Sequence, residues 1–451
     1  MRSRLSLYGV LIAVFAIGLV PVGGQQPPPT TPAPAGAQVE GGAGRGAGAG
    51  RRGGRGGGRG AAVRSPEVAA DQRVTFRLRA PNAKEVAVSF GGNTRPMQRD
   101  DQGVWSATTE PLEPNIYTYS LVVDGTSLND PANRQVQTSW SGHTSMFVVP
   151  GADPWFPKAG VPRGVVARHR FASSIASDER EFFVYTPPGY DPRRSRRYPL
   201  LFLLHGLGDD AERWLNGGAA PVILDNLIAE GKAVPMVVVT TLGYGTSQGP
   251  NAPSAAIVTG YERILMTEVL PLVEESYHVS NSRDERGIAG LSMGGAESIY
   301  TSLNNLDRFA WVGSFSGAFV MWPNPTARGA GPAAAAAPAA APGAPAVVAP
   351  GTPTPGAAAP EGGRGRGGGA AITPAALDQL FPTVSSRLNS QLKLLWISCG
   401  TADGLLGVNR TFKEWLRSKD VRFYEEEAEG VGHVWPLWRQ DFTNFAQRVF
   451  K

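Results

Sequence analysis

The sequence predicts two folded regions, a small antiparallel β-sandwich followed by a larger, mostly parallel sheet with helices on both faces. Residues 66–150 alternate apolar and polar side chains with a period of two, and turn-forming residues separate the runs. Residues 165–451 instead alternate short apolar runs with helical segments, which is the pattern of a doubly wound α/β fold. A chain of 451 residues is long enough for both regions and for low-complexity segments besides.

The first 24 residues have the composition of a secretory signal peptide. Two arginines precede an uncharged apolar run from Leu5 to Val20, and small residues follow up to Gly24, near which we expect cleavage. The alternative is an uncleaved inner-membrane anchor, although the run is marginal for spanning a bilayer. Cys399 is the only cysteine, so no intramolecular disulfide can form, and exported bacterial proteins can do without one. We therefore expect a secreted or periplasmic bacterial protein that meets a membrane only if this segment stays attached.

Two segments are too poor in apolar residues to fold. Residues 25–65 are rich in Pro and then in Gly and Arg, and residues 327–371 are rich in Ala, Pro and Gly. These segments and the signal peptide hold the basic excess, so the remaining residues are mildly acidic although the whole chain has a net charge of +5. The basic runs lack the aromatic residues on which nucleic-acid bases stack. We expect a solvated linker and a disordered surface insertion, and no nucleic-acid partner; a lid over the site is the alternative for the insertion.

Apolar residues at every second position define the buried faces of the expected sandwich strands. These residues are Val74, Phe76 and Leu78, then Val86, Val88 and Phe90, and then Tyr117, Tyr119, Leu121 and Val123. The aromatic residues Trp105, Trp140 and Tyr117 are candidates for sugar binding if they lie exposed, and core or interface residues if they do not. The sequence leaves both roles open.

The second region is organised around RGIAGLSMGG, residues 286–295, in which Ser292 lies between Gly290 and Gly294. A short apolar run precedes the serine and a helical segment follows it. A serine on so tight a strand-to-helix turn needs glycine on both sides, because a Cβ there would collide with the neighbouring elements. The chain has 57 glycines, so the motif alone decides little and its context must support it.

Asp403 and His433 supply that context. Asp403 directly follows the expected strand LKLLWISCG, and His433 directly follows VRFYEEEAEG. The order Ser, Asp, His with each residue in a strand-end loop is that of the α/β-hydrolases. We therefore expect a triad in which Asp403 orients His433 and His433 takes the proton of Ser292. The alternatives are that Asp403 caps a helix and that His433 is an ordinary turn residue.

Two backbone N–H groups are expected to bind the oxyanion of a tetrahedral intermediate. Met293 directly follows the serine, and Leu207 follows His205-Gly206 at the end of the PLLFLL strand. His205 is then a structural residue of this loop and not a base. The sequence has no cluster with metal-ligand spacing and no Gly-rich phosphate loop apart from the serine turn, so we expect neither a metal nor a cofactor.

Residues 165–451, except the insertion, resemble the esterase family that contains feruloyl and acetyl-xylan esterases, carbohydrate esterase family 1. Enterochelin esterases and bacterial mycolyltransferases are its relatives. The resemblance is carried by residues 200–240, RGIAGLSMGG, LLWISCGTADGLL and GVGHVWPLWR. It implies an α/β-hydrolase fold with the same triad and oxyanion donors. Trp214 and Trp435 lie in matching stretches and are candidates for substrate binding, with packing as the alternative.

Residues 66–150 resemble the early-set, immunoglobulin-like domains that precede some glycan-active enzymes, through VTFRLRAPNAKEVAV, GVWSATTEPLEPNIYTYSLVVDG and NDPANR. Together the two resemblances imply an exported serine esterase that removes feruloyl or acetyl groups from a plant polysaccharide such as xylan. Its partner is then a polysaccharide or a small ester. Three alternatives stay open: a siderophore esterase, an acyltransferase, and a secreted glycan-binding protein without catalysis.

Overall fold

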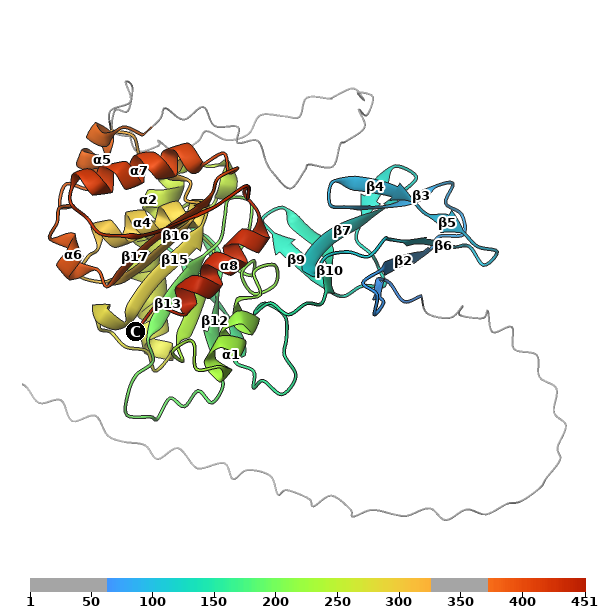
Figure 1. Cartoon of the computed structure of the whole chain (residues 1–451), viewed down its shortest axis with the longest axis horizontal. Helices are drawn as coiled ribbons and strands as arrows, with labels where there is room; N and C mark the ends of the chain where they lie inside the picture. Colours follow the sequence, from blue (N-terminus) through green and yellow to red (C-terminus); the bar gives the residue numbers. More distant parts are fainter. Residues whose placement is uncertain (1–62, 326–371) are drawn as a thin grey trace, which may run out of the picture. The chain divides into compact units, whose positions relative to one another are not determined.

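The computed structural model describes residues 63–325 and 372–451, which form two successive regions of different architecture (Figure 1). The predicted signal peptide (1–24) and insertion (327–371) lie outside these residues, as does all but the end of the predicted linker (25–65). At that end, Ser65 is buried, and its hydroxyl accepts a hydrogen bond from the N–H of Arg77 (3.0 Å). Within the two described ranges, no helix is long and apolar enough to cross a membrane.

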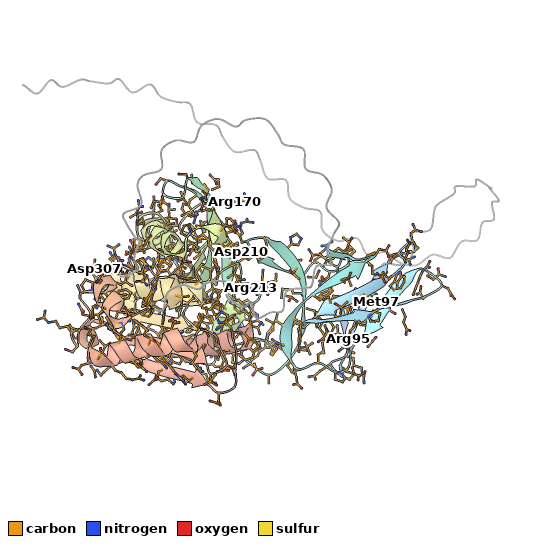
Figure 2. All side chains as sticks on the ribbon, turned by 90° about the horizontal axis from the view of Figure 1, so that it is seen from above. Arg95, Met97, Arg170, Asp210, Arg213 and Asp307 are labelled. Atoms are coloured by element: carbon orange, nitrogen blue, oxygen red, sulfur yellow. The ribbon has the colours of Figure 1, made fainter. Side chains whose placement is uncertain are left out.

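Two antiparallel sheets make up the first region. Their strands are β1 (Glu67–Val68), β2 (Val74–Arg79), β3 (Val86–Phe90), β4 (Asn93–Pro96), β5 (Gln98–Arg99), β6 (Val104–Thr108), β7 (Asn115–Val123), β8 (Thr126–Leu128), β9 (Val136–Ser139) and β10 (Gly142–Val149). One sheet has the order β1-β2-β6-β5, and the other has the order β4-β3-β7-β10-β9 with β8 beside β7. Alternate residues of β2, β3 and β7 face one shared core, as their period of two predicts, and Met97 lies in the same core (Figure 2).

This core is aromatic at its centre. The rings of Phe76, Tyr119 and Phe147 have centroids 4.8 to 5.6 Å apart. The region is thus a β-sandwich by its own packing, while its relation to immunoglobulin-like domains stays a prediction.

The three aromatic candidates for sugar binding differ in exposure. Trp105 is buried, and its indole N–H donates to the carbonyl of Ala80 (2.9 Å). Tyr117 is partly buried and stacks on Phe147. Trp140 is 37% exposed, so it offers the most surface of the three.

The segment between the sandwich and the second region, residues 150–164, is packed. Trp155 and Phe156 are buried in a core cluster of the second region. The side-chain amide of Asn226 donates to the carbonyls of Pro154 (2.7 Å) and Phe156 (2.9 Å).

An eight-stranded sheet forms the second region. Its strands are β11 (Val165–Ser173), β12 (Asp178–Thr186), β13 (Leu200–Leu204), β14 (Val237–Thr241), β15 (Arg286–Leu291), β16 (Trp311–Phe315), β17 (Leu394–Gly400) and β18 (Tyr424–Ala428). Their order is β11-β12-β14-β13-β15-β16-β17-β18. β14 to β18 in this order are parallel, and β11 and β12 are antiparallel to their neighbours. The strand order reverses at β13, so the edge at the end of this strand is where sites in such sheets collect.

Helices cover both faces of this sheet (Figure 1). They are α1 (Ala220–Ala229), α2 (Ser254–Ile264), α3 (Leu270–Ser276), α4 (Met293–Asn304), α5 (Pro374–Leu380), α6 (Leu388–Gln391), α7 (Leu406–Ser418) and α8 (Trp435–Ala446). Three short 3-10 turns, η1 (Gly249–Asn251), η3 (Arg283–Glu285) and η4 (Phe319–Met321), and a π-helical segment between α2 and α3, η2 (Leu265–Val269), complete the helical elements of the described residues. Leu201 and Leu203 of β13 pack with α1 and α8, whereas Phe202 packs with α2, α4 and α7 on the other face. A strand buried on both faces is apolar at every position, which is why PLLFLL is a continuous apolar run.

Two elements differ clearly from the sequence prediction. The helical pattern predicts a last helix from Gln440, whereas α8 begins at Trp435 with Pro436 in its first turn, a position that favours proline. The earlier start places Trp435, Trp438 and Arg439 on a helix. The patterns also do not predict β11, because its side chains are mostly exposed at the edge of the sheet.

We expect Asn226→Ala to lower the free energy of unfolding by about 1–3 kcal/mol, because the carbonyls of Pro154 and Phe156 lose their donor. Denaturant unfolding measures this loss, and proteolysis within residues 150–164 should accelerate. Asn304→Ala is the matched control, since this exposed amide donates only to a carbonyl of its own helix. Equal stabilities of the two variants would contradict the packing of this segment.

Candidate active site

Ser292 occupies a strained backbone position at the turn from β15 into α4. Its φ of 52° and ψ of −115° lie outside the regions that most residues adopt. Its N–H donates to the carbonyl of Phe315 (2.8 Å), and its carbonyl accepts from the N–H of Ala318 (2.8 Å). These bonds to the end of β16 and the loop behind it hold the serine in the strained conformation.

The two flanking glycines are required by close backbone contacts. A Cβ on Gly294 would lie 2.6 Å from the carbonyl oxygens of both Leu204 and His205. A Cβ on Gly290 would lie 2.6 Å from the carbonyl of Gly294 itself. Any side chain at either position would therefore push the start of α4 away from β13 and β15.

His433 and Asp403 are joined by a short hydrogen bond of 2.7 Å between Nδ1 and Oδ2. A carboxylate only accepts, so Nδ1 carries the proton and Nε2 is left as the basic nitrogen. The Asp403 carboxylate also accepts from the N–H of Leu405 (2.8 Å). Burial alone would raise the pKa of Asp403, but the bond and charge of His433, with lesser help from Leu405 and Ser316, hold the pKa below its usual value.

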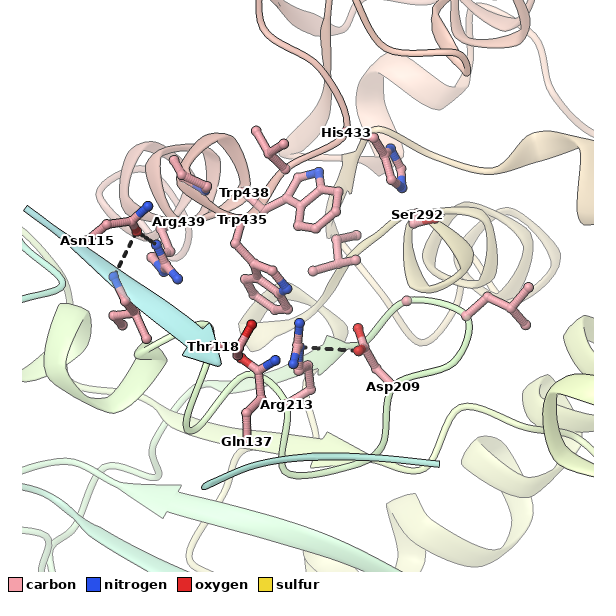
Figure 3. Close-up of a pocket in the computed structure, with 16 residues that line it drawn as sticks. Asn115, Thr118, Gln137, Asp209, Arg213, Ser292, His433, Trp435, Trp438 and Arg439 are labelled. Carbon is pink, nitrogen blue, oxygen red and sulfur yellow. Dashed lines mark hydrogen bonds and ion pairs between the residues drawn. The ribbon is translucent and has the colours of Figure 1, made fainter. Parts of the chain in front are cut away.

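Ser292 and His433 line the same pocket, where Figure 3 shows them side by side. The strands that carry the three predicted residues end at one edge of the sheet, since β15, β17 and β18 are parallel. The structure therefore pairs Asp403 with His433 and places His433 and Ser292 in one pocket, while their roles as a catalytic triad stay a prediction.

Leu207 and Met293 each present a backbone N–H near this serine. Leu207 is 51% exposed and lines the pocket, and Met293 begins α4. Among the described residues, neither N–H has a hydrogen-bond acceptor. A helix N-terminus with an uncommitted N–H favours a developing negative charge.

His205 holds the loop that carries Leu207. Its ring is buried, and Nε2 accepts from the N–H of Gly243 (2.9 Å), so Nδ1 holds the proton and faces the carbonyl of Gly206 (2.7 Å). Burial lowers the pKa of His205 to about 4, so the ring is neutral at pH 7. This residue has the structural role that the sequence predicts for it.

The pocket has a volume of about 410 Å³ and is lined from both regions of the chain. Trp435 and Trp438 give it indole surface, and the ring of Trp438 lies edge-on to that of His433 at 4.7 Å. The sandwich contributes Asn115 and Gln137. Among the described residues, no group of His, Cys, Asp and Glu is arranged to hold a metal ion.

Two arginines belong to the wall of this pocket, and sequence patterns do not point to either (Figure 3). The guanidinium of Arg213 lies over the ring of Trp435 at 4.9 Å and pairs with Asp209 at 3.2 Å. Arg439 donates from Nη1 to Oδ1 of Asn115 (2.8 Å). A helical arginine that joins a residue of the sandwich leaves no local signal in the sequence.

Trp214 does not have the role that the sequence proposes. Its side chain is fully buried, its indole N–H donates to the carbonyl of Leu204 (2.8 Å), and it does not line the pocket. Its ring lies edge-on to Trp435 at 5.2 Å. Trp214 therefore supports Trp435 from behind, and Trp435 is the residue of this pair that can meet a substrate.

Asp209 lines the pocket, and the pKa of its carboxyl group is markedly raised. Burial raises its pKa to about 6, although the charge of Arg213 acts in the opposite direction. The pocket therefore gains a negative charge as the pH rises through this value.

Comparisons with known proteins agree with a hydrolytic site. Residues 173–346 match the Esterase family, which is described as "Putative esterase". The chain is 33% identical over 269 residues to an endo-1,4-β-xylanase/feruloyl esterase of Xylanibacter ruminicola, a match that spans 57% of the chain and 36% of that protein. It is 32% identical over 145 residues to endo-1,4-β-xylanase Y of Acetivibrio thermocellus, which spans 30% of the chain and 12% of that protein. The chain thus spans about a third or less of the length of these curated relatives.

Among solved structures, the chain is similar to the enterobactin esterase of Shigella flexneri, with a TM-score of 0.54 and 20% sequence identity. The likeness covers 84% of the chain and 93% of that protein. At this identity it concerns the fold alone, which is that of an α/β-hydrolase. The family match and the first of the curated relatives above, which is named in part as a feruloyl esterase, thus point to the same class of enzyme.

The raised pKa of Asp209 predicts how its replacement changes stability with pH. The folded state favours the neutral carboxyl group of Asp209, so the bound proton stabilises the fold below about pH 4. This stabilisation is lost as the pH rises from about 4 towards 6. Between pH 4 and pH 7 we expect wild type to lose up to about 3 kcal/mol relative to Asp209→Asn. Urea unfolding at both pH values measures this difference, with Asp307→Asn, at an exposed position, as control. A pH-independent difference between wild type and Asp209→Asn would contradict the assignment.

Proposed function

We propose that this protein is an exported serine esterase, a carboxylic ester hydrolase that removes acyl groups from a plant polysaccharide such as xylan, with feruloyl as the preferred acyl group. The observation that carries the proposal is one pocket that holds Ser292 and a His433 whose Nδ1 is bound to Asp403. The composition of residues 1–24 supports export.

In the proposed mechanism, the Ser292 hydroxyl attacks the ester carbonyl while Nε2 of His433 takes its proton. Asp403 keeps the imidazole in the required tautomer and stabilises the imidazolium. The proton then passes to the leaving alcohol, which departs and leaves an acyl group on Ser292. A water molecule activated by His433 attacks this acyl-enzyme, the carboxylic acid leaves, and the serine regains its proton.

The N–H groups of Leu207 and Met293 would stabilise the negative oxygen of each tetrahedral intermediate. Both donors are uncommitted in the described part of the chain, so they need not give up another bond. Removing one such donor typically costs about 3–4 kcal/mol of transition-state stabilisation.

The shape and chemistry of the pocket favour feruloyl over acetyl. A cavity of about 410 Å³ far exceeds an acetyl group, and Trp435 offers a flat apolar surface to an aromatic ring. Asn115 and Gln137 can bind the phenolic hydroxyl and methoxy oxygens of a ferulate ring. The relative from Xylanibacter ruminicola, named as a xylanase and feruloyl esterase, supports the same substrate class.

A siderophore ester is the second candidate, and the two arginines favour it. Arg213 and Arg439 place positive charge in the pocket wall, which suits an acyl group with acidic catechol hydroxyls. The fold likeness to enterobactin esterase adds no weight, because it concerns the fold alone.

Release of ferulate and acetate from feruloylated and acetylated xylan tests the proposal. We expect ferulate release by wild type, and a loss of at least about 10³-fold in Ser292→Ala, because the nucleophile is removed. A Ser302→Ala variant, which removes a buried hydroxyl of α4 outside the pocket, is the control. Hydrolysis of a catecholate ester without ferulate release would favour the second candidate, and full activity in Ser292→Ala would contradict the mechanism.

We expect Trp435→Ala to lower kcat/KM for a feruloyl ester by about tenfold or more, mainly through KM, because the ring loses its stacking surface. The effect on an acetyl ester of the same alcohol should be much smaller. Trp435→Phe should recover part of the loss, since it restores an aromatic face. Equal losses for the two esters would show that Trp435 supports the fold of the site and does not bind the acyl group.

A further inference from the structure

We propose that the β-sandwich takes part in catalysis by holding the loop of the oxyanion donor Leu207, through its β9–β10 hairpin. This inference rests on the proposed function, which gives the N–H of Leu207 its role. It assigns Thr138 and Trp140 as positioning residues of the active site.

The loop that follows β13 needs external support. Leu207 is 51% exposed, and the next residue, Gly208, has a left-handed φ of 87°. An exposed loop with a glycine at its tip has many accessible conformations, and an oxyanion donor works only in a fixed one.

The hydrolase region supports this loop from the inside. The hydroxyl of Tyr244 accepts from the N–H of Gly208 (2.8 Å) and donates to the carbonyl of Asp209 (2.9 Å). Tyr244 thereby fixes one side of the two residues that follow Leu207.

The hairpin of the sandwich supports the same loop from the other side. The N–H of Trp140 donates to the carbonyl of Gly208 (3.1 Å), and the hydroxyl of Thr138 donates to Oδ1 of Asp210 (3.0 Å). The ring of Trp140 lies edge-on to that of Tyr244 at 5.1 Å. Gly208 is thus held through its N–H by the hydrolase region and through its carbonyl by the sandwich.

The hairpin can transmit this restraint because the sheet that carries it is itself anchored. Ile116 of β7 and Val148 of β10 pack against the core cluster that contains α1 and α8. Arg439 of α8 donates to Asn115 at the start of β7. Apolar packing and a charged hydrogen bond therefore fix the same sheet that ends in the hairpin.

These contacts also give Trp140 a packing role, so its partial exposure does not require a sugar ligand. Its ring lies against Tyr244, and a Cβ on Gly249 would lie 2.4 Å from it. The surface that stays exposed is what remains after the ring has packed on the hydrolase region.

The test is steady-state kinetics of the full chain with 4-nitrophenyl acetate, a small ester that makes little use of the pocket walls. Thr138→Val removes the hydroxyl that bonds Asp210 and keeps the shape of the side chain. We expect kcat to fall on the order of tenfold with KM within about twofold, because the oxyanion donor is misplaced in the transition state. Thr138→Ser should restore most of the loss. Thr126→Val, an exposed threonine of β8, is the matched control and should behave as wild type.

Trp140→Ala provides a second variant, since it removes the ring contact with Tyr244 and should lower kcat in the same way. Unchanged kcat in both variants, whether or not the melting temperature falls, would overturn the proposal and leave a purely structural contact. A higher KM on feruloylated xylan with unchanged kcat on the small ester would likewise overturn it in favour of glycan binding. Failure of the proposed function would give a different result from failure of this inference. The wild type would then not hydrolyse 4-nitrophenyl acetate, or Ser292→Ala would hydrolyse it as fast as the wild type.

Discussion

The site depends on the close approach of three backbone segments beneath Ser292. Gly294 at the start of α4 lies against the carbonyls of Leu204 and His205, and Gly290 lies against Gly294. Ser292, with its φ of 52°, lies between these two glycines, and the packing places the start of α4 against the end of β13. The same contact sets Met293, at the start of α4, against the end of β13, from which the chain runs on to Leu207, so the proposed nucleophile and oxyanion donors depend on one packing arrangement.

Outside this turn, the proposed catalytic groups lie on loops, and each loop is fixed by polar contacts from neighbouring elements. His205 and Tyr244 hold the loop after β13, and Asp403 orients His433 on the loop after β18. The sandwich adds a further layer through Thr138 and Asn115. By sequence, the sandwich resembles a separate binding module. In the structure it forms part of the pocket wall and contacts the loop after β13.

Local patterns were sufficient to place Ser292, Asp403 and His433, because each follows an apolar strand and the parallel sheet brings strand ends to one edge. The period of two likewise gave the buried faces of the sandwich. Local patterns could not give the pairing of Arg439 with Asn115, which are 324 positions apart and meet only when two regions dock. Nor could local patterns show that Trp214 is buried behind the pocket whereas Trp435 lines it.

The central claim is that Ser292 carries the acyl group during turnover. Rapid acid quenching of the enzyme with a slowly hydrolysed aryl ester, followed by peptide mass spectrometry, tests it most directly. The account predicts an acyl adduct on the peptide that contains Ser292, formed at the rate of the product burst and absent after replacement of His433. Turnover without a detectable adduct, or an adduct on another residue, would contradict it.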